Sequence, residues 1–432
     1  MTLISTSAAL ADICKSLSRA DYLTVDTEFM RESTFWPQLC LLQIAGPDDA
    51  VAVDPLAEGM DLTPVLELLA DTSIVKVMHA ARQDMEIFFN LTGELPRPLF
   101  DTQVAAMVCG FGDQVGYEAL IAKLTGTRLD KSSRFTDWAR RPLSDEQLQY
   151  ALGDVTHLRP AYEALLERVE ESGRLDWIEA EISLLCDPAI YRVEPDQAWR
   201  RLKPKRNEPR YLALLQAVAA WRENEAVTRN VPRNRVMRDE ILLQIAARPP
   251  SDAAALDRMR GLSKGFSNGR LGASLLEAVA QGMALSPELA PTAKLKPELP
   301  SGIGPLTDLL KVLLKYKCEE HQVAQKLVAN TSDLEQIAAD DNADTLALKG
   351  WRRELFGADA LRLKHGEVAL SATGTHVRLV TVNGAGDIDP LPAVDEPARN
   401  GGKRRRSRRR RQGQDATETS ETAPATTDGA PD

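Results

Sequence analysis

The sequence contains no long apolar run and few cysteines, and each absence excludes a class of protein. No stretch approaches the roughly 18 consecutive apolar residues that a membrane-spanning helix requires, so we expect no membrane segment. The stretch MTLISTSAALADICKSLSRADY has an early aspartate and no apolar block behind a basic start, which argues against a secretory signal and predicts a cytoplasmic protein. The five cysteines are odd in number and far apart. They fit neither a disulfide framework nor a zinc cluster and indicate reduced, mostly buried thiols.

The charge balance hides a local asymmetry. The formal net charge of −10, taken alone, disfavours a nucleic-acid partner. Between Trp199 and Ile241, however, eleven lysines and arginines stand against five acidic residues. KRRRSRRRR at 403–411 is a cationic run inside a tail that ends acidic. Because local charge rather than the net figure steers binding, a nucleic-acid partner stays open.

Length and periodicity together indicate an α/β domain followed by helical ones. A chain of 432 residues exceeds one compact core, so about two to four domains are expected. Short β-type runs and helical runs alternate within residues 22–103, which predicts a mixed sheet flanked by helices. The helical run ARQDMEIFFNLTG should stop near Gly93. Strand signals nearly vanish from about residue 144, where Ser144 and Gln147 form a capping-box pattern and Pro160 should end or kink the helix.

Two helical blocks follow a linker or domain entry at 195–209. Each block has an amphipathic opening helix and then a short helix with an IAA triplet, and a proline-rich stretch separates them. Two copies are too few for a solenoid, so we interpret them as a degenerate repeat. HVRLVTVNG is a candidate short strand with no assigned role. The predicted division is an α/β domain at 1–193, two small all-α domains at 207–287 and 303–372, and a disordered basic and acidic tail at 385–432.

Two carboxylates, Asp26 and Glu28, lie two residues apart in the apolar run YLTVDTEF. Side chains two apart on a strand share a face, so these like charges project together. Alone, such a pair is more often a solvated feature of an edge strand. Two further acids, however, border apolar stripes of predicted helices, Asp84 in HAARQDMEIFF and Asp154 in QLQYALGDVTHL. The expected neighbours are Ala81, Phe88 and Leu91 for Asp84, and Ala151, Val155 and Leu158 for Asp154.

Four acids aimed inward from different elements predict a cation site. Their mutual repulsion in a low-dielectric environment would raise their pKa values or unfold the region, and divalent cations remove that penalty. Oxygen-only ligands suit Mg²⁺ or Mn²⁺, and the absence of a cysteine or histidine cluster argues against zinc. Tyr150 lies four residues before Asp154, so on a helix its phenol stands beside that carboxylate, where it can aim a water molecule. A core aromatic is the alternative interpretation of this tyrosine.

The order of these residues resembles that of the tyrosine-type DEDD exonucleases: D-x-E in VDTEF, then the aspartate of HAARQD, then Y-x-x-x-D in YALGD. The stretches VDTEFMRESTFWPQLCLLQIA, VMHAARQDMEIF and LFDTQVAAMVCG are similar to the ribonuclease D family over about residues 1–190. NVPRNRVMRDEILLQIAARPP resembles a helicase-and-ribonuclease-D C-terminal (HRDC) domain, and GWRRELFGADALRLKHGEVAL resembles a second one. The tail from about residue 385 is not part of this pattern.

The resemblance implies a ribonuclease H-like exonuclease fold and a metal-dependent 3′→5′ exoribonuclease. Such an enzyme releases nucleoside 5′-monophosphates from a free RNA 3′ end, and the implied process is tRNA 3′ maturation. The expected partner is RNA with a free 3′ end, such as a tRNA precursor, with no membrane and no obligate protein partner. The resemblance also implies Tyr150 as the residue that orients the attacking water. The implied ligands of two divalent ions, Mg²⁺ or Mn²⁺, are Asp26, Glu28, Asp84 and Asp154.

Aromatic residues and arginines are the candidates for substrate binding. Phe29 can stack on a terminal base, with a core position on the sheet as the alternative. Phe35 and Trp36 form either a wall for the substrate or the packing of a hairpin. Asp101 in FDTQ recurs in the resemblance and is assigned a structural or supporting role, whereas His79 is assigned none. Four arginines either neutralise phosphates or pair with nearby acids on a solvated helix face: Arg229, Arg233, Arg235 and Arg238.

Two other functions stay open at this point. A 3′→5′ DNA exonuclease of the same superfamily is possible because the cation site does not itself contact the 2′-hydroxyl. A non-catalytic nucleic-acid-binding adaptor would bind without a Mg²⁺-dependent product, and the complete set of four acids and the tyrosine disfavours it. The second helical block is not visibly basic, so we expect it to act as a spacer or brace.

Overall fold

The structure is a computed structural model that describes residues 2–129, 136–204, 206–292 and 299–382. The described residues belong to one compact unit. The predicted disordered tail at 385–432, with its basic run, lies outside the described residues. Within those residues no helix has the length and apolar character needed to cross a bilayer. All five cysteines are free and four of them are buried, as predicted.

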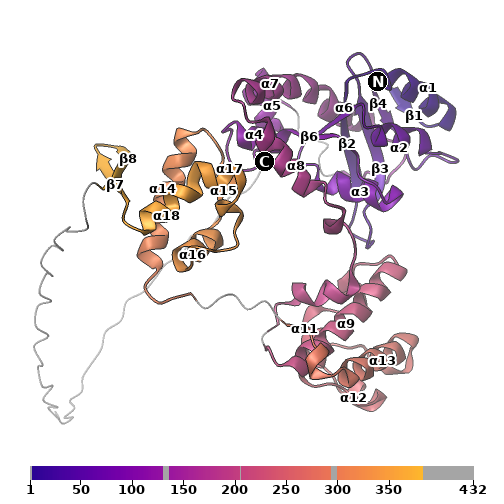
Figure 1. Cartoon of the computed structure of the whole chain (residues 1–432). Coiled ribbons are helices and arrows are strands. Elements are labelled where there is room, and N and C mark those ends of the chain that lie inside the picture. Colours follow the sequence, from indigo (N-terminus) through magenta and orange to yellow (C-terminus); the bar gives the residue numbers. More distant parts are fainter. Residues whose placement is uncertain (1, 130–135, 205, 293–298, 383–432) are drawn as a thin grey trace, which may run out of the picture. The chain divides into compact units, whose positions relative to one another are not determined.

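A six-stranded mixed sheet forms the centre of the N-terminal domain (Figure 1). The strands are β1 (Thr2–Ile4), β2 (Tyr22–Met30), β3 (Gln38–Ala45), β4 (Ala50–Val53), β5 (Val75–Met78) and β6 (Leu99–Asp101). In space they follow the order β1-β4-β3-β2-β5-β6. The β2–β3 and β3–β4 pairs are antiparallel, whereas the β1–β4, β2–β5 and β5–β6 pairs are parallel. The predicted mixed sheet is therefore confirmed.

Helices cover both faces of this sheet, and β2 lies between two cores. One face packs against α1 (Ser7–Leu17), α2 (Thr63–Ala70) and α3 (Arg82–Thr92). The other face packs against α4 (Thr102–Val108), α5 (Tyr117–Thr125), α6 (Asp145–Thr156) and α7 (Leu158–Glu171), and α8 (Leu175–Leu185) follows. Because successive side chains of a strand alternate, β2 gives Leu23 and Val25 to the first core and turns Thr24 and Asp26 toward α6.

The predicted ends of α6 and α3 are confirmed. Ser144 and Gln147 form a reciprocal capping box at the start of α6. The helix stops before Pro160, which lies in the first turn of α7, where its missing N–H removes no helical hydrogen bond. Gly93 ends α3 in the left-handed conformation, with φ of 79°. The expectation for Leu91 was wrong, because this side chain is 49% exposed rather than packed beside Asp84.

An ion pair ties the segment that leads into α6 to the sheet. The Arg141 guanidinium donates to both carboxylate oxygens of Asp54, at 2.6 and 2.7 Å, and to the carbonyl of Cys40 on β3 at 2.7 Å. It also donates to the carbonyl of Trp138 at 2.8 Å, within its own segment. Asp54 directly follows β4 and is buried. This single arginine therefore fixes the entry of α6 against two strands.

The C-terminal part contains the two helical blocks. The first consists of α9 (Pro209–Thr228), α10 (Arg233–Val236), α11 (Asp239–Ala247), α12 (Ala253–Asp257), η3 (Phe266–Asn268) and α13 (Arg270–Ala284). The second consists of α14 (Gly304–Glu320), α15 (Gln325–Val328), α16 (Thr331–Ala339), η5 (Leu346–Leu348), α17 (Gly350–Arg352), η6 (Arg353–Gly357) and α18 (Ala358–Lys364). Both begin with a long helix, a four-residue helix and a nine-residue helix, which supports the interpretation as a degenerate repeat.

Short elements flank these blocks and correct one expectation. The chain passes through η1 (Pro188–Ile190) and η2 (Pro195–Leu202) before the first block, and through η4 (Pro287–Leu289) after it. Trp199 in η2 is only 2% exposed and packs in the core of the first block, which favours the domain entry over the linker among the two interpretations of 195–209. The second block is not all-α, because β7 (Val368–Thr373) and β8 (His376–Thr381) form an antiparallel hairpin at its end. The candidate strand in HVRLVTVNG is thereby confirmed as β8.

Removing the acid of the α6 anchor should destabilise the N-terminal domain. Asp54→Ala leaves the Arg141 guanidinium without its carboxylate, and we expect a loss on the order of 2–3 kcal/mol in the free energy of unfolding. Thermal and urea unfolding followed by circular dichroism measure this loss. Asp61→Ala is the matched control, since Asp61 is an exposed aspartate that only accepts the bonds of its own turn. Equal losses in the two variants would contradict the anchoring role.

Candidate active site

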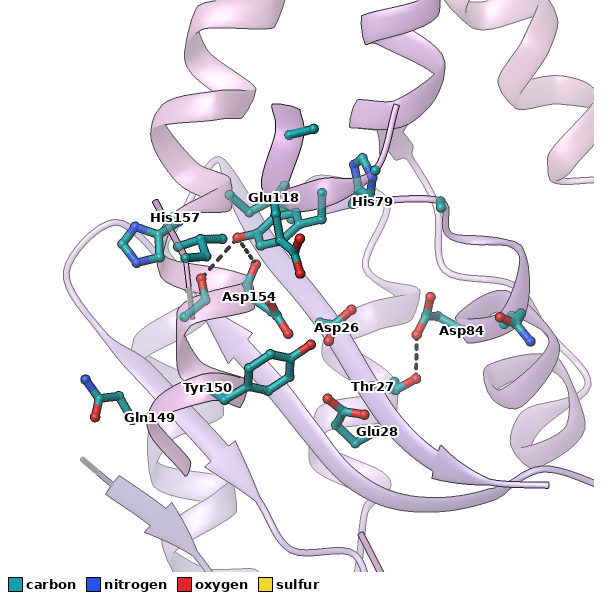
Figure 2. A pocket seen from close by; sticks show the side chains of 18 of the residues that line it. Asp26, Thr27, Glu28, His79, Asp84, Glu118, Gln149, Tyr150, Asp154 and His157 are labelled. Atoms are coloured by element: carbon teal, nitrogen blue, oxygen red, sulfur yellow. Dashed lines mark hydrogen bonds between the residues drawn. The ribbon is translucent and has the colours of Figure 1, made fainter. Parts of the chain in front are cut away.

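Three carboxylates from two elements meet at one point above the sheet. Asp26 and Glu28 project from β2 and Asp154 projects from α6 (Figure 2). Each offers a carboxylate oxygen, and these oxygens lie within 4.8 Å of one another. The sequence had predicted this convergence from the two-residue spacing on β2 and from the apolar neighbours of Asp154. An oxygen-only donor set at this spacing fits hard divalent cations.

Two hydroxyl groups hold α6 in the position that brings Asp154 close to β2. The Thr24 hydroxyl donates to the carbonyl of Val155 at 2.8 Å, which ties the helix to the strand. The Tyr117 hydroxyl on α5 donates to the carbonyls of Gly153 and Asp154, at 3.0 and 2.8 Å. The sequence analysis missed Tyr117, because it belongs to no motif and only the tertiary fold brings it to α6.

Asp84 approaches the cluster from the first turn of α3 and lies outside the group of three. Its side chain is only 7% exposed. The hydroxyl of Thr27, the middle residue of the D-x-E stretch, donates to the Asp84 carboxylate (Figure 2). Thr27 alternates with Asp26 and Glu28 along β2, so it faces the side from which α3 arrives. Thr27, which lies between the predicted ligands Asp26 and Glu28, therefore anchors Asp84.

Burial and like charge raise the pKa values of the acids in this cluster. The pKa of Asp26 is well above its ordinary value because of burial first and then the charges of Asp154, Asp84 and Glu28. Burial raises the pKa of Asp84 to about 7, the charge of Asp101 adds to this effect, and the Thr27 hydrogen bond opposes it. Without cations the cluster therefore retains protons near neutral pH, and bound cations would replace those protons.

The cluster opens into a cavity of about 1020 Å³. Its wall includes Asp26, Glu28, Asp84 and Asp154, together with Tyr150 and Phe29. In Figure 2 the Tyr150 hydroxyl points toward the carboxylates, as expected for a residue one turn before Asp154. The register between β2 and β3 shifts between Glu28 and Phe29. Such a bulge re-aims a side chain, which explains how two successive residues of β2 both reach the cavity.

The structure corrects the substrate-binding role of Phe35. This side chain is 6% exposed and packs in the core of the first helical block rather than in the described wall of the cavity. Trp36 is half-buried against the same core. The backbone N–H groups of Phe35 and Trp36 both donate to the side-chain oxygen of Asn230, at 3.1 Å each. Neither alternative for TFWP describes these contacts, because the segment packs against the first helical block.

The four predicted arginines divide into two groups. Arg233 pairs with the buried carboxylate of Glu223, and its guanidinium carbon lies 4.4 Å from the centre of the Phe35 ring. We therefore correct the assignment of Arg233, which packs and pairs within the protein. The other three arginines are exposed and have no ion-pair partner among the described residues: Arg229, Arg235 and Arg238.

Comparison with known proteins first defines the class. A family model described as 3′-5′ exonuclease matches residues 1–170, and a model described as HRDC domain matches residues 211–279. The mixed sheet and its carboxylate cluster lie in the first of these regions. The predicted HRDC-like character of residues 303–372 stays a prediction.

Full-length relatives then identify the family. The chain is 51% identical over 383 residues to the ribonuclease D of Granulibacter bethesdensis, covering 88% of this chain and 96% of the relative. It is 50% identical over 384 residues to the ribonuclease D of Jannaschia sp., covering 88% and 99%. The crystal structure of Escherichia coli RNase D matches with a TM-score of 0.73 and 32% identity, over 84% of this chain and 98% of that one. The chain belongs to the ribonuclease D family.

The raised pKa of Asp84 predicts how stability depends on pH without metal. An unfolded Asp84 ionises near pH 3.8, whereas the folded one keeps its proton up to about pH 7. The folded state therefore binds more protons over this range, and its stability falls as the pH rises. We expect Asp84→Asn to melt at a higher temperature than the wild type at pH 8 in EDTA, with the difference shrinking toward pH 4.

Differential scanning fluorimetry across this pH range measures the effect. Asp145→Asn on α6 is the matched control, because Asp145 is exposed at the start of the same helix that carries Asp154. Mg²⁺ or Mn²⁺ should raise the melting temperature of the wild type more than that of Asp84→Asn. A lower melting temperature for Asp84→Asn at pH 8 without metal would contradict the repulsive cluster.

Proposed function

We propose that Asp26, Glu28, Asp84 and Asp154 hold two divalent ions, Mg²⁺ or Mn²⁺, at which the chain hydrolyses RNA from a free 3′ end. Membership in the ribonuclease D family makes the chain a 3′→5′ exoribonuclease, which is a hydrolase. The observation that carries the proposal is the set of carboxylate oxygens within 4.8 Å of one another at the edge of an open cavity. Like charges this close together are unfavourable at neutral pH unless cations or protons balance them.

The divalent ions and the side chains have separate roles in the proposed reaction. Divalent ions in such a site lower the pKa of a water nucleophile and stabilise the charge on the departing 3′ oxygen. The Tyr150 hydroxyl points toward the carboxylates and orients the attacking water. The water oxygen bonds to phosphorus, the P–O3′ bond breaks, and the products are a nucleoside 5′-monophosphate and a shortened RNA with a 3′-hydroxyl. The attacking water loses one proton to solvent, and the departing O3′ takes a proton from solvent to become the 3′-hydroxyl.

The surroundings of the cluster select a single-stranded end. Phe29 lies in the cavity wall beside Glu28. There it can stack on the terminal base of the strand, whichever base that is. Three exposed arginines of the first helical block, Arg229, Arg235 and Arg238, supply positive charge for phosphates further along the strand. Structured RNA with a 3′ extension, such as a tRNA precursor in the cytoplasm, is the substrate that this arrangement and the family favour. A DNA strand is the competing substrate.

Loss of one carboxylate should abolish turnover while the fold survives. We expect Asp26→Asn and Asp154→Asn to reduce kcat by at least about 10²–10³-fold, because a preorganised electrostatic partner of the transition state is lost. Tyr150→Phe should be slower but fully folded. The assay is incubation of a 3′-extended tRNA and a DNA of the same sequence with Mg²⁺, with products resolved by length. Stepwise loss of single nucleotides from RNA is expected, with Asp145→Asn as the active control.

Three outcomes would contradict this assignment. Near-normal activity of Asp26→Asn in saturating Mg²⁺ would remove Asp26 from the ligand set. An unchanged rate for Tyr150→Phe would return Tyr150 to the interpretation as a core aromatic. Internal cuts would indicate an endonuclease, and faster hydrolysis of the DNA would favour the DNA exonuclease.

Neutralising the exposed arginines should weaken binding without slowing the chemistry. We expect Arg235→Gln and Arg238→Gln to raise KM for the tRNA substrate severalfold at unchanged kcat, and to lower the salt dependence of binding by about 0.7 in slope for each lost contact with single-stranded RNA. Arg270→Gln is the matched control, because Arg270 is exposed in the same block but pairs with Glu225. If Arg270→Gln has the same effect as Arg235→Gln and Arg238→Gln, the proposed phosphate contacts are wrong.

A further inference from the structure

A buried carboxylate outside the ligand set joins two helices of the site. Asp101 ends β6 and is 2% exposed. Its carboxylate accepts hydrogen bonds from the backbone N–H groups of Gln103 and Val104 in the first turn of α4, at 2.8 and 3.4 Å. It also accepts from the N–H groups of Ala80 and Ala81, at 3.0 and 2.8 Å, in the turn that enters α3. An ordinary N-cap needs only the first pair.

The turn that Asp101 holds is strained. Ala80 has φ of 56°, in the left-handed region that is unfavourable for a residue with a Cβ atom. Such a conformation persists only where the surrounding structure enforces it. Helix α3 starts directly after this turn. The methyl side chain of its N-cap residue, Ala81, cannot accept a capping hydrogen bond. The hydrogen bonds that Asp101 accepts from Ala80 and Ala81 therefore fix the start of α3.

Neighbouring residues reinforce the same connection. The Thr102 hydroxyl donates to the carbonyl of Met78 at 3.1 Å. The Nδ1 atom of His79 lies 3.0 Å from the same hydroxyl oxygen. Consecutive residues from Met78 to Ala81 are thus bonded to Asp101 and Thr102.

We propose that Asp101 is a positioning residue that holds the Ala80 turn, and through it the first turn of α3, so that Asp84 is presented to the cations of the site. This inference rests on the proposed function. Asp101 touches neither substrate nor the three-carboxylate group. It acts through Asp84, which follows Ala81 by three residues and lies on the same turn of helix.

Geometry and charge make opposite predictions for a neutral residue at this position. The negative charge of Asp101 opposes ionisation of Asp84. If charge alone mattered, Asp101→Asn would ease the ionisation of Asp84 and strengthen cation binding. If Asp101 positions α3, the same substitution weakens cation binding, because an amide NH₂ would face a backbone N–H that now contacts an oxygen.

The experiment compares cation binding by the full chain of the wild type and of Asp101→Asn. We expect the Mn²⁺ concentration for half of the metal-induced rise in melting temperature to increase about 10–100-fold, which is the usual effect of losing a residue that orients a metal ligand. The Mg²⁺ concentration for half-maximal hydrolysis should increase in parallel, and activity should recover largely at high Mg²⁺. The thermal measurement needs neither substrate nor turnover.

A rescue variant separates positioning of α3 from capping of α4. Glycine adopts positive φ without strain, so Ala80→Gly in the Asp101→Asn background should restore most of the metal response. Asp252→Asn is the matched control, because Asp252 caps α12 of the first helical block through Ala255 at 2.7 Å. It should lower stability without altering the metal response. Ala80→Val tests the turn without touching Asp101, and a β-branched residue there should weaken the metal response as Asp101→Asn does.

The outcomes distinguish this inference from the proposed function. If the wild type shows no metal response, the proposed function fails. If the wild type responds and Asp101→Asn responds at the same or a lower Mn²⁺ concentration, the positioning role is overturned. Should Asp101→Asn not fold, an unchanged metal response in Ala80→Val overturns the inference instead.

Discussion

The repulsion among buried carboxylates is the constraint on which the rest of this structure depends. Asp26 faces the charges of Asp154, Asp84 and Glu28, and its partial burial strengthens their repulsion. A group of this kind costs free energy in a metal-free fold and becomes favourable only when cations or protons balance it. The N-terminal domain can therefore be understood as a scaffold that holds these acids together against their own charge.

The scaffold uses neutral donors and one further acid rather than cationic partners. Thr24 and Tyr117 bind backbone carbonyls of α6, and Thr27 binds the carboxylate of Asp84. An arginine at any of these places would neutralise a ligand and compete with the cations. Arg141, the arginine that fixes the entry of α6, is instead paired with Asp54 at the end of β4. Rigidity is thus supplied without neutralising the charge on which cation binding depends.

The sequence was sufficient for the acids but not for what holds them. Asp26, Glu28 and Asp154 were predicted because strand alternation and helix periodicity are local rules. Tyr117 and Thr27 were missed because their partners are set by how α5, α6 and α3 pack. Phe35 and Arg233 were misassigned for the same reason: Asn230, nearly two hundred residues away in sequence, binds the loop that carries Phe35 and makes it part of another core. The run HVRLVTVNG predicted β8 correctly, whereas its partner β7 was not predicted.

The two helical blocks share an order of elements but differ in what their charged and aromatic residues do. In the first block Arg235 and Arg238 remain exposed. In the second, Arg352 pairs with Glu181 of α8, and Trp351 stacks on Trp177 with ring centres 4.2 Å apart. The backbone N–H of Ala324 donates to the carbonyl of Met107 near the end of α4, at 2.9 Å. Because Asp101 caps the other end of α4, the second block contacts the helix whose start is tied to the turn before α3, an arrangement expected for a brace.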